Sequence, residues 1–160
     1  MKTKSVALLL VGTALVSGCA NTSLRVAKPV TERPKSVTLS IDNQSKSPSL
    51  EEEMLGLKEV LTDKLQDEGI KVVANDKDAY RLTGEFANYE SGNRALRWFV
   101  GFGVGKASYD SNWKLVSASG EVLGNCNIDG YVRMGFTGGS LSGMHKDLGE
   151  AVADCVKGER

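Results

Sequence analysis

Alternation of apolar and polar residues along the chain predicts a series of strands. The alternation has a period of two, and it predicts strands at 37–41, 80–89, 107–117 and 122–134. The last of these is the clearest, because apolar or small residues occupy every second position from Val122 to Met134. A short apolar run at 70–73 predicts one more strand.

Two further segments have the spacing of amphipathic helices. Apolar residues recur three or four positions apart in the first of them, at Leu50, Met54, Leu57, Leu61 and Leu65. The second begins near Leu141, and its stripe comprises Leu141, Met144, Leu148, Val152 and either Cys155 or Val156. At the start of the first helix, Ser49 followed by Glu52 fits a capping box.

These elements predict an α+β domain with two layers. Their order is β-α-β-β-β-β-α, and the hairpin-like spacing of the later strands favours antiparallel pairing. Each helix needs a surface on which to bury its apolar stripe. We therefore expect a mixed or antiparallel sheet whose one face is covered by both amphipathic helices.

The chain begins with the three parts of a secretory signal. Lys2 and Lys4 precede an apolar run over 6–16, and Ser17 and Gly18 follow it. The run is shorter than the roughly 20 apolar residues that a membrane-spanning helix needs. We predict that residues 1–18 form a signal peptide that is cleaved.

The residues at the end of this signal predict a lipid anchor. The sequence Leu-Val-Ser-Gly-Cys at 15–19 resembles the bacterial lipobox, in which the cysteine receives acyl chains such as palmitate. Cys19 is therefore the predicted lipidation site. Stable attachment takes two or more acyl chains. Ala20 follows the cysteine, and the absence of Asp there favours the outer membrane over the inner membrane, with the domain facing the periplasm.

The mature chain is expected to have two parts. Residues 19–36 lack either period and contain Pro29 and Pro34, which predicts a flexible tether behind the lipidated cysteine, with a reach of roughly 20–25 Å. Residues 37–160 are then a single globular domain.

Charge argues against nucleic acid as a partner. The whole chain has 20 basic and 20 acidic residues, and cleavage after residue 18 leaves 18 basic residues against 20 acidic ones. A nearly neutral exported domain has no electrostatic footprint for nucleic acid. The glycine-rich segment 101–107 does not fit a P-loop either: Gly101 lies one residue too close to the Gly-Lys pair, and Ala107 cannot bind magnesium.

The aromatic residues beside that segment have two interpretations. Arg97, Trp98, Phe99 and Phe102 could form an exposed apolar segment for a partner or for the bilayer surface. The alternative is that the aromatic side chains are simply core, as most apolar runs are.

The same region carries a family resemblance. The sequence NRALRWFVGFGVGKA at 93–107 resembles the central motif of a family of small bacterial lipoproteins of unknown function. The resemblance extends from about Val37 to the C-terminal helix. It implies no reaction, cofactor or substrate, because the family has no assigned activity.

The remaining candidates for chemistry are two cysteines and one histidine. Cys126 lies on the apolar face of the last strand and Cys155 on the stripe of the last helix, so an oxidising compartment would favour a disulfide between them; the alternative is two separate buried thiols. His145, the single histidine, is expected on an exposed or lateral helix face. No metal site, cofactor site or catalytic group is predicted.

We therefore expect a lipid-anchored envelope protein that binds or helps to assemble another envelope component and is not an enzyme. Two alternatives stay open. One is an enzyme or small-ligand binder whose site is assembled from residues far apart in the sequence. The other is a lipoprotein that assembles with itself, with an oligomeric state that the sequence leaves open.

Overall fold

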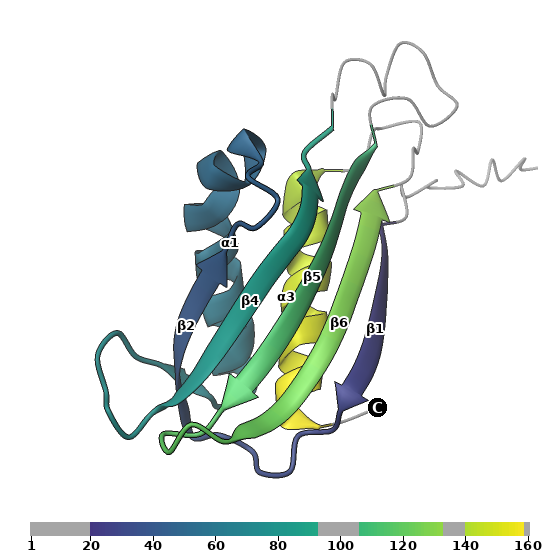
Figure 1. Ribbon diagram of the computed structural model, residues 1–160. Helices are drawn as coiled ribbons and strands as arrows, with labels where there is room; N and C mark the ends of the chain where they lie inside the picture. The colour runs from purple at the N-terminus through teal and green to yellow at the C-terminus, as the bar shows by residue number, and fades with distance from the viewer. Residues whose placement is uncertain (1–19, 93–105, 133–139, 159–160) are drawn as a thin grey trace, which may run out of the picture.

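The structure is a computed structural model that describes residues 20–92, 106–132 and 140–158 (Figure 1). In chain order its elements are β1 (Ala20–Lys28), β2 (Ser36–Asp42), α1 (Pro48–Asp67), β3 (Lys71–Val72), β4 (Tyr80–Glu90), β5 (Ala107–Val116), β6 (Val122–Val132) and α3 (Leu141–Lys157). This is the predicted α+β order with one additional strand at the start.

All the described strands join one mixed sheet. The strand order is β1-β6-β5-β4-β2-β3. The pairs β1·β6, β6·β5 and β5·β4 are antiparallel, whereas β4·β2 and β2·β3 are parallel. Parallel neighbours require a crossover connection, and α1 supplies it between β2 and the strands that follow.

The sheet and the two helices form two layers. In Figure 1 both α1 and α3 lie behind the sheet, so they cover the same face. The leucine stripe of α1 is buried as predicted, with Leu50, Leu57, Leu61 and Leu65 all fully covered. A Lys64–Glu150 ion pair of 3.0 Å joins the two helices at their exposed side.

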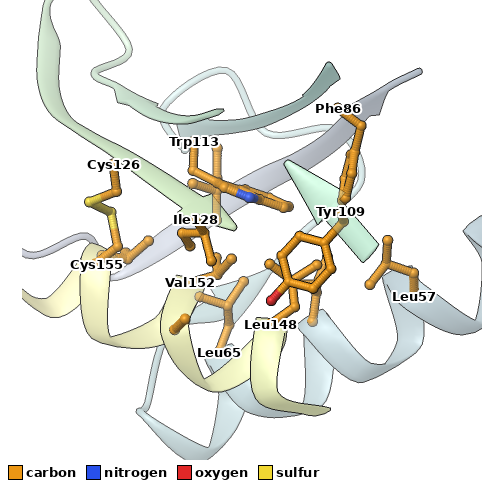
Figure 2. Packing of buried hydrophobic residues seen from close by; sticks show 14 of the residues in the cluster. Leu57, Leu65, Phe86, Tyr109, Trp113, Cys126, Ile128, Leu148, Val152 and Cys155 are labelled. Carbon is orange, nitrogen blue, oxygen red and sulfur yellow. A yellow bond between two sulfur atoms is a disulfide. The ribbon is translucent and has the colours of Figure 1, made fainter. Parts of the chain in front are cut away.

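An aromatic cluster forms the centre of the core (Figure 2). The Phe86 ring makes edge-to-face contacts with Tyr89, Tyr109 and Trp113, with centroid distances of 5.9, 6.4 and 6.2 Å. The buried indole Nε1 of Trp113 donates to Ser111 Oγ at 3.0 Å, and that hydroxyl donates in turn to the carbonyl oxygen of Ile128 at 2.9 Å. The polar atoms of the cluster are therefore hydrogen-bonded inside the core.

The additional strand replaces half of the predicted tether. Residues 20–28, expected to be flexible, form β1 and pair with β6 from Ala20 opposite Val132 to Lys28 opposite Asn125. Leu24 and Val26 of β1 contact the core. The prediction of a tether over 19–36 was wrong for this part, because pairing with a strand about 100 positions away leaves only a weak local signal.

The start of α1 also differs from the prediction. Its first residue is Pro48 and its N-cap is Ser47, so Ser49 and Glu52 lie inside the helix. The Asn43 side chain instead fixes the backbone of Ser47, the residue just before the helix. Its Nδ2 donates to the Ser47 carbonyl oxygen at 2.9 Å, and its Oδ1 accepts from the Ser47 amide at 3.2 Å.

Candidate functional site

One end of the sheet gathers the starts and ends of several described segments. Ala20 and Ala107 both lie opposite Val132, so the first residue of β1, the first of β5 and the last of β6 are neighbours. We call this end of the sheet the Ala20 end. Glu90 of β4 also lies there, opposite Ser108.

Several predicted site residues fall outside the described residues. These are Cys19, which directly precedes β1, and the segment with Arg97, Trp98, Phe99 and Phe102. The described chain stops before that segment at Gly92 and resumes after it at Lys106, next to the Ala20 end.

A buried hydrogen bond connects α3 to β4 near this end. His145 Nε2 and Tyr89 Oη are 2.8 Å apart, and the two residues are only 4% and 2% exposed. Burial lowers the pKa of His145, while the Glu53 carboxylate acts in the opposite direction. Burial also raises the pKa of Tyr89. The pair is thus neutral at pH 7, and the expectation of an exposed or lateral His145 was wrong.

The face of the sheet opposite the helices carries a continuous row of polar side chains. Each member lies directly opposite the next on the neighbouring strand, in the order Arg25, Asn127, Asn112, Glu85 and Asp42. We call this set the cross-sheet row. It begins with a cation on β1 and ends with an anion on β2.

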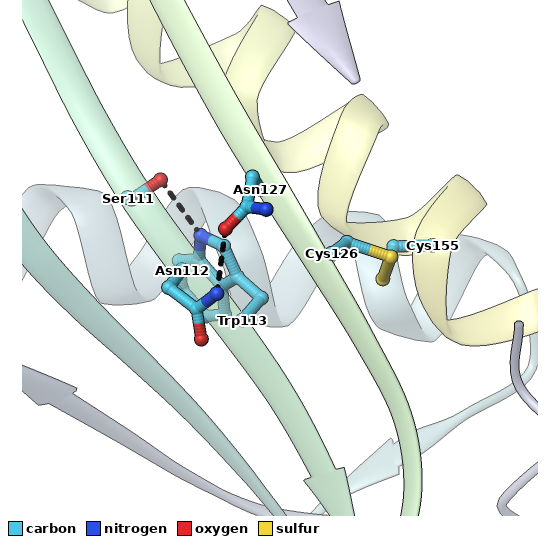
Figure 3. The surroundings of a disulfide bond; sticks show 6 residues. All are labelled: Ser111, Asn112, Trp113, Cys126, Asn127 and Cys155. Carbon is cyan, nitrogen blue, oxygen red and sulfur yellow. Dashed lines mark hydrogen bonds between the residues drawn. A yellow bond between two sulfur atoms is a disulfide. The ribbon is translucent and has the colours of Figure 1, made fainter. Parts of the chain in front are cut away.

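The polar groups on this face bind largely to one another. Asn112 Nδ2 donates to Asn127 Oδ1 at 2.6 Å (Figure 3), Lys114 Nζ is 3.1 Å from both carboxylate oxygens of Glu85, and Arg25 contacts Asp129 at 2.5 Å. Within the described part of the chain, the Oδ1 atoms of Asn112 and Asn125 are covered and have no partner. Such covered acceptors carry a desolvation cost.

The sheet has two incompletely covered edges. Among the described strands, the nine-residue β1 has a neighbour only on its β6 side. At the opposite edge, the pairing of β3 within the described residues is limited to Ser36 and Val37, and the Val73 amide next to it donates to the Val37 carbonyl oxygen at 2.9 Å. Among the described residues, β2 therefore has no strand neighbour on this side from Thr38 onward.

A groove lies beside the uncovered part of β2. It has a volume of about 310 Å³ and is lined by Thr38 and Leu39 of β2, by Lys58 and Thr62 of α1, and by residues 72–74. A larger hollow of about 440 Å³ lies nearby, where Lys77, Arg81 and Asp76 contribute charge. Both are open surface features.

Two cysteines connect the sheet to the second helix. Cys126 of β6 and Cys155 of α3 form a disulfide, with a Cα–Cα distance of 6.3 Å (Figure 3). The bond links α3 covalently to β6, the strand that pairs with β1. The described cysteines are therefore not available as nucleophiles or metal ligands. In the described ranges no group of three or more His, Cys, Asp or Glu side chains is arranged to hold a metal ion.

Among the described residues, no helix is long and apolar enough to span a bilayer.

A comparison with sequence families decides the family of the chain. Residues 28–135 match the family described as domain of unknown function DUF4410. The chain belongs to the DUF4410 family. This confirms the resemblance to a family without an assigned function, so no catalytic or binding residue can be transferred from it. No curated protein matches the sequence.

Solved structures with a similar fold exist despite low sequence identity. The DUF4410 chain is similar to the PelC dodecamer from Paraburkholderia phytofirmans, with 17% identity, a TM-score of 0.53, and coverage of 89% of this chain and 99% of that chain. A point variant of the same dodecamer gives a TM-score of 0.52 at the same identity and coverage. The rare lipoprotein B from Shewanella oneidensis is similar at 13% identity, with a TM-score of 0.39 and coverage of 76% and 90%. At these identities the PelC match shows a shared fold and nothing more.

Proposed function

We propose that this DUF4410 protein is a lipid-anchored module of the bacterial cell envelope that assembles with copies of itself and binds no substrate for catalysis. The observation that carries the proposal is the position of β1. The strand begins at Ala20, so the folded sheet starts one residue after the proposed lipidation site, Cys19. Lipid on that cysteine would hold the Ala20 end of the sheet at the bilayer surface.

Features of the described surface support assembly over catalysis. Several charged side chains of the open face are paired within the chain, as in the Lys114–Glu85 and Arg25–Asp129 pairs. The two sheet edges, in contrast, offer backbone groups that another strand can bind. PelC, which shares the fold, was solved as a dodecamer. This makes assembly with identical copies the more specific form of the proposal.

The described residues on either side of the predicted apolar segment fit the same orientation. These residues, Gly92 and Lys106, lie next to the end of the sheet from which β1 starts. We propose that Trp98, Phe99 and Phe102, with Arg97 beside them, contact the bilayer surface or a neighbouring envelope protein. The outer membrane is the proposed location, since Ala20 and not Asp follows the cysteine.

Metabolic labelling tests the anchor directly. Cells expressing the full chain are grown with radiolabelled palmitate, and the protein is then immunoprecipitated and its membrane fraction measured. We expect label on the wild type and none on Cys19→Ser. The matched control is Cys126→Ser/Cys155→Ser, which removes the other two cysteines of the chain and should keep the label. Equal labelling of the wild type and Cys19→Ser would contradict the anchor.

Crosslinking in intact cells tests assembly and the apolar segment. We expect the wild type to be captured with other copies of itself, and we compare it with Trp98→Ala/Phe102→Ala after checking by circular dichroism that this variant is folded. Loss of membrane contact or of capture in the folded variant supports the segment as a contact. A wild type that stays monomeric in the membrane would contradict the assembly function.

A further inference from the structure

We propose that β1 of one copy pairs with the uncovered part of β2 of the next copy, so that the sheet continues from molecule to molecule. The contact joins two different edges: residues Arg25–Lys28 of β1 in one copy pair with residues Thr38–Asp42 of β2 in the next copy. It rests on the proposed function, because it names the surface through which the anchored copies assemble. A head-to-tail contact of this kind forms a ring when the rotation between copies closes.

The directions of the strands permit this pairing. Three antiparallel pairings and one parallel pairing lead from β1 across the sheet to β2, so β1 and β2 run in opposite directions. Figure 1 shows the same, with the arrows of β1 and β2 pointing to opposite ends of the sheet. When two copies stand side by side with the same orientation, the two edges therefore meet as antiparallel strands, which can form a regular ladder.

The anchor selects this contact over its symmetric alternative. Antiparallel pairing of β1 with β1 of a second copy would turn that copy upside down. Its Ala20 end would then lie at the far end of a nine-residue strand, about 30 Å from the bilayer. Pairing of β1 with β2 keeps every Ala20 end at the same level, so all copies can be anchored in one membrane.

The side chains at the two edges are complementary. The cross-sheet row starts with Arg25 on β1 and ends with Asp42 on β2, so copies placed at equal height bring the cation opposite the anion. The next row, on the face toward the helices, starts with Val26 and ends with Ile41. Both are partly buried apolar residues packed on the edge of the core. Opposite charges and apolar pairs across a ladder stabilise antiparallel strands.

The β2 edge also has room for an incoming strand. β3 ends at Val72, and the groove of about 310 Å³ beside Thr38 and Leu39 is open at this place. The occupant that fits is a strand with a basic residue level with Asp42 and an apolar residue level with Ile41. β1 of another copy meets both conditions.

Engineered disulfides test the contact in the full, membrane-anchored chain. In Arg25→Cys/Asp42→Cys the new cysteines lie at opposite edges, four strand spacings or about 19 Å apart, and cannot bond within one molecule. After mild oxidation we expect a ladder of dimers, trimers and larger species on a non-reducing gel, which collapses with reductant. A mixture of the two single variants should stop at dimers. Arg25→Cys/Asp110→Cys is the matched control, because Asp110 is exposed in the interior of the sheet, and it should give no ladder.

Charge reversal provides an independent measurement. Arg25→Asp and Asp42→Arg should each weaken self-association about fivefold in sedimentation experiments in detergent, and the combined variant should restore it. Arg25 also binds Asp129 of its own chain. Asp129→Asn therefore serves as the control: it removes the competing carboxylate of the same chain, so it should not weaken association.

The results of these experiments distinguish a failure of the β1–β2 contact from a failure of the proposed self-assembly. The cysteine ladder together with rescue by the double reversal supports the contact. Dimers from Arg25→Cys alone would show a symmetric β1 contact and overturn it. An oligomeric wild type that gives no ladder would overturn the contact and leave assembly standing. A monomeric wild type would overturn both.

Discussion

The replacement Gly84→Ala probes the packing of the sheet against Trp113, the largest fully buried side chain among the described residues. Gly84 lies in β4 directly opposite Trp113 of β5, and the indole ring covers it. A Cβ atom at this position would lie 2.5 Å from Cη2 of the ring and 2.6 and 2.7 Å from Cζ2 and Cζ3. The ring cannot move aside cheaply, because it is fully buried, contacts Phe86 edge-to-face, and donates its Nε1 proton to Ser111.

The expected loss of stability follows from these contacts. Overpacking of a filled core costs about 1–3 kcal/mol. Displacement of the indole also removes a buried hydrogen bond worth about 1 kcal/mol. The lower backbone entropy of the unfolded alanine variant returns about 0.4–1 kcal/mol. We expect Gly84→Ala to lower the free energy of unfolding by about 2–3 kcal/mol.

Urea denaturation of residues 20–160, followed by far-UV circular dichroism, measures this difference. With a urea slope of about 1.5–2 kcal/mol per molar, the midpoint should fall by about 1–2 M. The matched control is Gly56→Ala in α1, where an added Cβ meets no atom within 4 Å. There alanine should raise stability by about 0.5–1 kcal/mol. A Gly84→Ala protein with the midpoint of the wild type would refute the close packing of Trp113 on Gly84.

Three further predictions concern the core and its pH dependence. Gly130→Ala should lower the urea midpoint in the same way, because its Cβ would lie 2.6 Å from the Tyr109 ring. Reduction of Cys126–Cys155, or its replacement by two alanines, should lower the free energy of unfolding by about 3.6 kcal/mol, since the bond closes a separation of 29 residues; a midpoint insensitive to reductant in the wild type would speak against it. Burial holds the pKa of His145 below its unfolded value of 6.5, so below pH 6.5 the unfolded chain binds more protons and stability should fall as pH falls. His145→Gln, which can still bond to Tyr89, should flatten that slope between pH 7 and 5.5; an unchanged slope would assign it to other groups.

The helices and the later strands were predictable because their signals are local. The stripe of α1 repeats every three or four residues from Leu50 to Leu65, and the alternation of β6 runs from Val122 to Val132. Each of these patterns requires only that one side of the element faces the core. The placement of both helices on one face followed from the same requirement.

Contacts between distant segments were much harder to predict. In β1, Thr22, Leu24 and Val26 do alternate with polar residues, which is a strand signal, but two prolines and many polar residues follow closely and favour the tether interpretation. The Tyr89–His145 bond joins residues 56 positions apart, and it depends on how α3 packs against β4. The cross-sheet row likewise depends on the register of five strands, which single-strand patterns do not fix.

The position of β1 changes how the proposed anchor acts. A flexible tether of 17 residues would let the domain turn freely within roughly 20–25 Å of its lipid, so that any face could meet a partner. With lipid on Cys19 and the sheet starting at Ala20, this freedom is lost, and the strands extend away from the membrane from a fixed end. The edges β1 and β2 then face the neighbouring copies, whereas the turn at 117–121 lies at the opposite end of the sheet from Ala20. Anchoring therefore presents the two uncovered edges to other anchored copies in the one orientation in which β1 and β2 can pair.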